Sequence, residues 1–111
     1  MRKRLTRDEI EGLLRSADFD PEYFPTEKEL APYITWFISN TEIRGSDDGK
    51  HLIAEDTVRM YLCDTDYCPE AELRLIEALA PVCESLTITR MYNADEHVNV
   101  SEFIAGLIGK L

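Results

Sequence analysis

The residues of this chain that are best suited to chemistry lie in the segment YLCDTDYCP, from Tyr61 to Pro69. Alternating apolar residues over 57–63 predict a strand that ends near Cys63, and Pro69 suits the first position of a helix. Cys68 is therefore expected at a helix N-terminus. The helix dipole stabilises a thiolate there and lowers the pKa of the thiol.

The order of strand, short loop and Tyr-Cys-Pro resembles the first strand and helix of glutaredoxin-like proteins, over about Val58 to Leu79. The resemblance implies that Cys68 is a redox nucleophile. Ala71 occupies the position of the family's second cysteine, and too few residues follow Tyr92 for the family's later strands. One hypothesis is thus a thiol-redox protein or sensor that uses Cys68, with Cys63 nearby in sequence. The opposing interpretation is that Cys68 caps the helix or is buried and behaves as a small apolar side chain.

The rest of the sequence carries no recognisable catalytic pattern. A zinc site would need a fourth ligand at a familiar spacing from the three cysteines, and His51 and His97 are isolated. There is no glycine-rich phosphate loop, and no pair of carboxylates stands out as a general acid and base. The sequence therefore predicts no catalytic residue, no metal and no cofactor.

The composition of the chain is strongly acidic. Its 111 residues include 22 acidic and 12 basic ones, which gives a formal net charge of -10. This charge disfavours binding to nucleic acid, because phosphate recognition needs clustered Lys and Arg. It favours a basic protein partner, which carboxylates attract over a distance. Solubility alone is the competing explanation of the charge.

The same composition bears on domain number and compartment. The length fits one domain over residues 1–111, in which residues 1–5 form a flexible basic N-terminus. Three cysteines do not suit a secreted disulfide scaffold. The sequence contains no apolar stretch typical of a signal peptide or a membrane span. We therefore expect a cytoplasmic protein with no membrane contact.

The N-terminal half is expected to be helical. Apolar residues at helical spacing predict a helix from about Arg7 to Ala17, which Thr6 and Glu9 begin as a capping box.

A second capping box is predicted at Thr26 and Glu29. The spacing over Leu30–Ile38 favours another helix, kinked or restarted at Pro32, although alternation around Trp36 fits a strand equally well.

The second half of the chain contains a clear turn at Gly45–Gly49, which either closes a hairpin or forms an exposed loop. After it we predict a strand over 57–63, a helix from Pro69, a strand over Leu86–Tyr92 and a helix over Val100–Leu111. A helix between two strands indicates a right-handed crossover that leaves the strands parallel. The expected fold class is α+β, small and α/β-like. Its helical N-terminal half packs on a small sheet, and its C-terminal half runs strand-helix-strand-helix.

The leading functional prediction is a small acidic protein-binding domain. It would act as an inhibitor, an immunity-type protein or a nucleic-acid mimic that occupies a basic surface, for example on a nucleic-acid enzyme or a toxin. The candidate contact residues are acids and tyrosines, namely Asp18, Asp20, Glu22, Tyr23, Asp47, Asp48, Asp64, Asp66 and Tyr67. A structural or oligomeric subunit without catalysis is a further alternative.

The charge pattern makes this prediction conditional on the fold. Residues 8–29 contain eight acidic and two basic residues, and residues 41–72 contain nine and three. If the two stretches meet on one face, a basic partner is favoured, whereas scattered charge indicates solubility.

Overall fold

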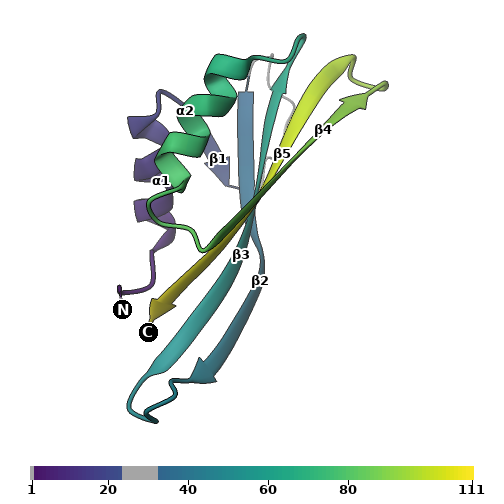
Figure 1. Cartoon of the computed structure of the whole chain (residues 1–111). Helices are drawn as coiled ribbons and strands as arrows, with labels where there is room; N and C mark the ends of the chain where they lie inside the picture. Colours follow the sequence, from purple (N-terminus) through teal and green to yellow (C-terminus); the bar gives the residue numbers. More distant parts are fainter. Residues whose placement is uncertain (1, 24–32) are drawn as a thin grey trace.

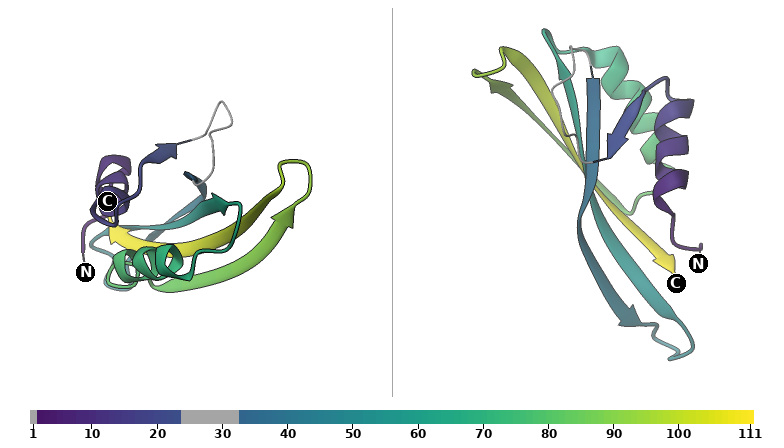
Figure 2. Two further views of the ribbon diagram at one scale, coloured as in Figure 1. Left: turned by 90° about the horizontal axis from the view of Figure 1, so that it is seen from above. Right: turned by 180° about the vertical axis from the view of Figure 1, so that it is seen from behind.

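The computed structural model describes residues 2–23 and 33–111, except for the side chains of residues 21–23 and 33. Five strands form one twisted sheet in the order β1-β2-β3-β5-β4, and two helices pack on the same face of it (Figures 1 and 2). The molecule measures 50 × 24 × 22 Å. It is elongated because the hairpin of β2 and β3 extends beyond the helices (Figure 1).

Four long strands are joined by antiparallel pairing. β2 (Tyr33–Gly45) and β3 (Leu52–Asp64) form a hairpin, β3 pairs with β5 (Val98–Lys110), and β5 pairs with β4 (Ser85–Asn93). The short β1 (Pro21–Tyr23) runs parallel to β2. The hairpin alternative for the Gly45–Gly49 turn is therefore confirmed.

Both helices begin where the sequence predicts. α1 (Arg7–Ser16) starts after Thr6, whose hydroxyl accepts from the backbone N–H of Glu9 while the Glu9 carboxylate accepts from the N–H of Thr6. This is the predicted capping box, which satisfies two backbone donors. α2 (Pro69–Leu79) has its proline in the first turn.

The expected fold class is wrong, because antiparallel sheet rather than helix dominates the chain. The first error concerns Leu30–Ile38. From Tyr33 onward this segment is the beginning of β2, in which Ile34 and Trp36 are buried and pack with the helices. The alternation of Ile34 and Trp36 was therefore the correct signal, and the helical spacing was misleading. Residues 30–32 and the capping box predicted at Thr26 lie outside the described residues.

The second error concerns the helix predicted over Val100–Leu111, which is the strand β5. Phe103 and Leu107 are buried against the helices, whereas Ile104 and Ile108 alternate with them and point to the other face. Because β5 is apolar on both faces, Phe103, Ile104, Leu107 and Ile108 fall at positions i, i+1, i+4 and i+5. One face of a helix shows the same spacing, so this sequence pattern fits a strand and a helix equally well.

α2 connects β3 to β4, and these two strands run parallel to each other as predicted, because both are antiparallel to β5. They do not pair, because β5 lies between them. The predicted strand-helix-strand-helix order fails at its last element, which forms a strand inside the sheet.

The main core lies between the helices and the sheet. It is centred on Trp36, Met60 and Phe103 from the strands, with Leu14 of α1 and Leu75 of α2 packed on them. All five side chains are fully buried. A smaller apolar cluster of Cys63, Val98 and Val100 lies on the other face of the sheet.

The first described residues extend the sheet along β5. The N–H of Arg4 donates to the carbonyl of Lys110 (2.8 Å), and the N–H of Lys110 donates to the carbonyl of Arg2 (2.9 Å). Gly109 makes this approach possible, since a Cβ there would lie 2.5 Å from the Cα of Arg4. In the segment where the sequence predicts a flexible N-terminus, residues 2–4 thus follow β5. As for membranes, neither α1 nor α2 is long and apolar enough to span one.

Candidate protein-binding surface

A cluster of exposed side chains that contact one another lies on β4, on the face that carries the helices. Ile88, Arg90 and Tyr92 alternate along this strand, and the ring of Tyr67 packs on the guanidinium of Arg90, 5.2 Å from its carbon to the ring centroid. Tyr67 is 37% exposed and Tyr92 is 58% exposed. We call these four residues the tyrosine–arginine surface.

A buried carboxylate fixes the arginine of this surface. Glu72, on the inner side of α2, accepts from Nε (3.1 Å) and from Nη2 (2.5 Å) of Arg90. The hydroxyl of Ser101 on β5 donates to the same carboxylate (2.8 Å). The hydrogen bonds from Arg90 lower the pKa of Glu72 and outweigh the opposing effect of burial. The guanidinium is therefore held in place although it remains exposed.

The loop before α2 is fastened to the same strands. The hydroxyl of Tyr67 donates to the carbonyl of Met91 (3.2 Å), and the amide of Asn99 donates to the carbonyl of Thr65 (2.8 Å). The hydroxyl of Tyr92 lies 3.5 Å from Nδ1 of His97 in the turn that follows β4. The bond to Met91 holds Tyr67 in place, whereas Tyr92 lies exposed beside His97.

Acidic residues border this surface on one side. Asp64 pairs with Asn99, and Asn99 pairs with Tyr92, so the three residues form a row across β3, β5 and β4. Two strand spacings separate Asp64 from Tyr92, which is roughly 10 Å. Asp66 is exposed in the loop that carries Tyr67. The structure thus brings together three of the predicted contact residues, Asp64, Asp66 and Tyr67.

Two other predicted residues lie at the opposite end of the sheet. Asp47 and Asp48 are in the turn between β2 and β3. This turn is separated from Asp64 by the whole length of β3, which is roughly 40 Å for a 13-residue strand. Nothing in this geometry lets them act together with the β4 end.

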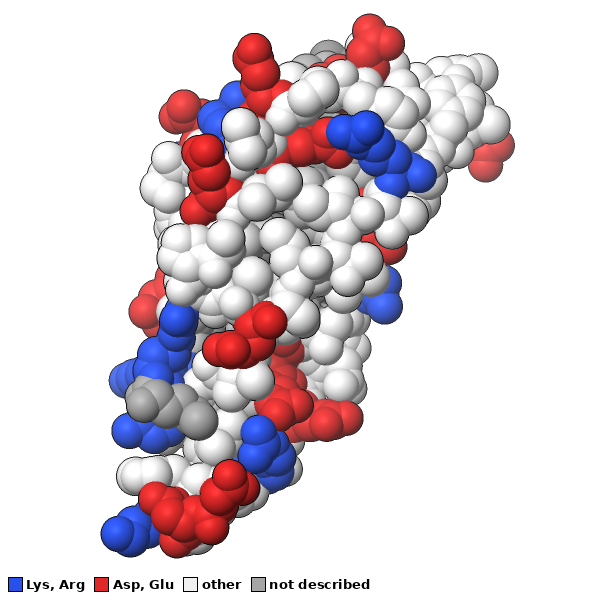
Figure 3. All heavy atoms as spheres, in the orientation of Figure 1, with Lys and Arg blue, Asp and Glu red and all other residues white. Residues whose placement is uncertain are grey.

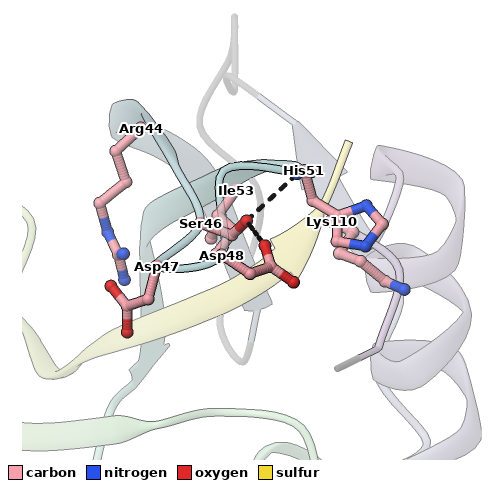
Figure 4. A pocket seen from close by; sticks show the side chains of 7 residues that line it. All are labelled: Arg44, Ser46, Asp47, Asp48, His51, Ile53 and Lys110. Atoms are coloured by element: carbon pink, nitrogen blue, oxygen red, sulfur yellow. Dashed lines mark hydrogen bonds between the residues drawn. The ribbon is translucent and has the colours of Figure 1, made fainter.

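An open hollow of about 450 Å³ lies beside that turn (Figure 4). Its lining residues are Arg44, Ser46, Asp47, Asp48, His51, Ile53 and Lys110. The Ser46 hydroxyl donates to the Asp48 carboxylate and accepts from the N–H of His51 (3.1 Å). The same carboxylate accepts from the N–H of Lys50 (3.0 Å). The bond from Ser46 is the main cause of the lowered pKa of Asp48. These polar groups stabilise the turn itself.

The remaining predicted contact residues lie at the end of α1 and in or just before β1, the strand at the opposite edge of the sheet from β4. Asp18, at the end of α1, has a positive φ of 65°, and Asp20 precedes β1. Glu22 and Tyr23 are in β1, at the other edge of the sheet from β4, and their side chains lie outside the described part of the chain. The predicted contact set is therefore divided among three regions.

The cysteines of the redox hypothesis lie on opposite faces of the sheet. Cys63 is buried beside Val98 and Val100, whereas Cys68 packs against the core below the helices. Cys68 precedes α2 but makes no side-chain capping bond. The third thiol, Cys83, has its pKa raised mainly by burial. None of the three cysteines forms a disulfide, and the fold does not place Cys63 and Cys68 as a pair.

On the side of the molecule seen in Figure 3, acidic side chains are interspersed with basic ones and do not form one acidic patch. Within 41–72, Asp56 and Glu72 are buried and paired with arginines, and Glu55 accepts from Arg44 (2.8 Å). In the part of the chain that the structure describes, no three His, Cys, Asp or Glu side chains are close enough to hold a metal ion.

Comparison with known proteins adds no family to this picture. No protein family matches the chain, and no curated protein is significantly similar to it in sequence.

Sequence reasoning missed the ion pair at the centre of the surface. Glu72 and Arg90 are 18 residues apart and come from a helix and a strand. Two signals were present. Arg90 is the one charged residue on a strand face that otherwise carries Leu86 and Ile88, and Glu72 shares the inner helix face with Leu75. A charged residue within an apolar face needs a partner when it is buried. Opposite charges on two such faces therefore indicate that Glu72 and Arg90 form an ion pair.

Proposed function

We propose that this chain is a protein-binding domain that docks through its tyrosine–arginine surface. The observation that carries the proposal is that two exposed tyrosines flank an arginine held by a buried carboxylate. Tyrosine and arginine supply most of the binding energy at many protein interfaces. Side chains that are fixed before binding lose less conformational entropy on docking.

The partner that fits this surface best is basic. The charge of Arg90 is balanced by Glu72, so the formal charge around the surface comes from neighbouring acids such as Asp64 and Asp66. These carboxylates speed association with a basic protein at low ionic strength. An inhibitor, an immunity-type protein and a nucleic-acid mimic are the forms that such a domain takes. The charge scattered over the remaining surface serves solubility.

The test is affinity capture from an extract of the cells that make the protein. Bound proteins are eluted with a salt gradient and identified by mass spectrometry. Tyr92→Ala, and Asp64→Asn with Asp66→Asn, are expected to reduce the captured basic protein at least roughly tenfold. The matched control is Asp47→Asn with Asp48→Asn, which removes the same charge at the distant turn and leaves capture unchanged. Equal capture by all variants, or a complex that is insensitive to salt, contradicts the proposal.

A further inference from the structure

The outer edge of β4, the last strand on its side of the sheet, is not paired with any other described strand. The strand has nine residues in unbroken register with β5, and it contains no proline. Every second residue of such an edge turns its N–H and C=O groups outward, where they can bond to another strand.

The other edge is protected by several features that β4 lacks. β1 has only three residues and begins at Pro21, which has no backbone N–H. Where β1 ends, β2 has a register shift between Ile38 and Asn40, and further along it carries the charged Glu42 and Arg44. Short strands, proline, bulges and charges are the usual means by which sheet edges avoid pairing. β4 carries one charge, on Arg90, and Glu72 neutralises it.

Exposed apolar side chains also gather near this edge. Among the described residues, the large exposed apolar ones on β4, on the loop before α2 and on α2 are Tyr67, Leu73, Ile88, Met91 and Tyr92. The other three, Ile43, Leu52 and Leu111, are at the far end of the β2–β3 hairpin or beside it. Apolar surface beside an unpaired strand favours burial by a partner.

We propose that two copies of this chain pair antiparallel through β4, with Thr89 facing Thr89 at the symmetry axis, so that the two five-stranded sheets become continuous. This register aligns all nine residues of the strand. It sets Leu86 opposite Tyr92 and Ile88 opposite Arg90. A register centred on Arg90 is disfavoured, because the two arginines would be directly opposite each other.

The charge distribution favours a second copy over a basic strand as the occupant. β4 contains Arg90 and no acidic residue, whereas the acid-rich stretches 8–29 and 41–72 belong to other elements. Two copies that meet at β4 therefore join the least acidic edge of each chain. The acids that attract a basic partner, Asp64 and Asp66, are outside β4, so a basic strand would find no carboxylate along this edge.

This pairing does not rest on the proposed function, but Ile88, Arg90 and Tyr92 of the tyrosine–arginine surface line the seam between the two copies. Thr89 alternates with Ile88 and Arg90 along β4, so its side chain is on the face opposite the tyrosine–arginine surface. The symmetry axis is perpendicular to the sheet, so both tyrosine–arginine surfaces remain on the same side of the joined sheets.

The experiment measures the mass of the full chain in solution over a range of concentrations, by sedimentation velocity at low ionic strength. The wild type is expected to form dimers. Thr89→Lys and Thr89→Glu each place like charges opposite each other and are expected to weaken self-association at least roughly tenfold. An equal mixture of the two variants is expected to form dimers again, because the charges then attract. Asn40→Lys, at the exposed part of the opposite edge, is the matched control and leaves the dimer intact.

Two outcomes overturn the proposal. One is a wild-type chain that stays monomeric at every concentration. The other is a mixture of Thr89→Lys and Thr89→Glu that associates no better than either variant alone. The mixture also separates a lost interface from a misfolded variant, since only folded strands can pair again.

Discussion

Two buried carboxylates, Asp56 on β3 and Glu72 on α2, are bound in almost the same way. Each accepts two hydrogen bonds from one arginine, at 2.9 and 2.9 Å from Arg4 and at 3.1 and 2.5 Å from Arg90. Each also accepts one from a hydroxyl. They differ in the exposure of the arginine, which is 33% for Arg4 and 53% for Arg90.

This difference shows that the role of each ion pair follows from the position of its arginine, because the two buried carboxylates are bound in the same way. Arg4 belongs to the first residues of the chain, and its bond to Asp56 fastens that segment across the sheet. Arg90 lies on an edge strand with Tyr67 packed on it, so its bond to Glu72 positions an exposed group. One pair fastens the first residues to the sheet, and the other positions an exposed arginine.

Removal of the more deeply buried pair is expected to have the largest effect. Asp56→Ala leaves Arg4 and the hydroxyl of Thr41 without their acceptor, so the free energy of unfolding falls by about 2–4 kcal/mol. Urea denaturation measures the change. Asp47→Asn, on the exposed turn, serves as the control and changes stability by less than about 0.5 kcal/mol. Equal stability of the two variants contradicts a structural role for Asp56.

The segment that carries Arg4 can also be displaced by a substitution on β5. Gly109→Ala places a Cβ 2.5 Å from the backbone of Arg4, which must move away, and we expect a loss of about 1–3 kcal/mol. Gly106→Ala is the matched control on β5. Its Cβ meets the Ser85 hydroxyl at 2.6 Å, and that side chain can rotate. If thermal denaturation finds Gly106→Ala the more harmful, the N-terminal segment does not hold the position described.

The exposed pair is expected to matter less for stability and more for binding. Glu72→Gln keeps the shape of the side chain but removes its charge, and the free energy of unfolding falls by about 1–2 kcal/mol. Capture of a basic partner falls as well, because Arg90 loses the group that orients it. Asp56→Asn supplies the comparison, since it is expected to impair stability but not capture by the folded fraction. If Asp56→Asn reduces capture by the folded fraction and Glu72→Gln does not, the roles assigned to the two ion pairs are wrong.

A pH titration of stability gives the smallest and most specific effect. The pKa of Glu72 is lowered in the folded chain, so its contribution is complete above the ordinary value of 4.5 and disappears as the pH falls through the lowered pKa. The difference in unfolding free energy between the wild type and Glu72→Gln is therefore constant near neutral pH and shrinks in acid. Urea denaturation from pH 7 to pH 3 measures it. A difference that grows on acidification is inconsistent with this pair.

Local signals in the sequence were sufficient for about half of the fold. The capping box at Thr6 and the proline at Pro69 each act within a few residues, and the helices begin there. The alternation in β3 was readable because only one face of that segment is strongly apolar. Val100–Leu111 was not readable, because a strand inside the sheet is apolar on both faces and its period is hidden.

From the sequence, only candidate residues that are neighbours along the chain could be expected to lie together. Asp64 ends β3, and Asp66 and Tyr67 follow in the next loop, so their proximity was predictable. Glu72 and Arg90 meet only because α2 lies across β5 and β4, and no local rule states that packing. Asp47 and Asp48 are acidic like Asp64, so composition alone does not distinguish them. The length of β3 shows that they lie far from Asp64.

The position of β5 has a consequence for biosynthesis. This strand follows β3 and β4 along the chain but lies between them in the sheet. On the ribosome, β4 therefore emerges before the strand with which it pairs, and both of its edges are open for as long as residues 98–110 remain in the exit tunnel. Unpaired strands of this kind are the segments that chaperones protect from aggregation. A nascent chain is expected to resist protease only after β5 has left the tunnel.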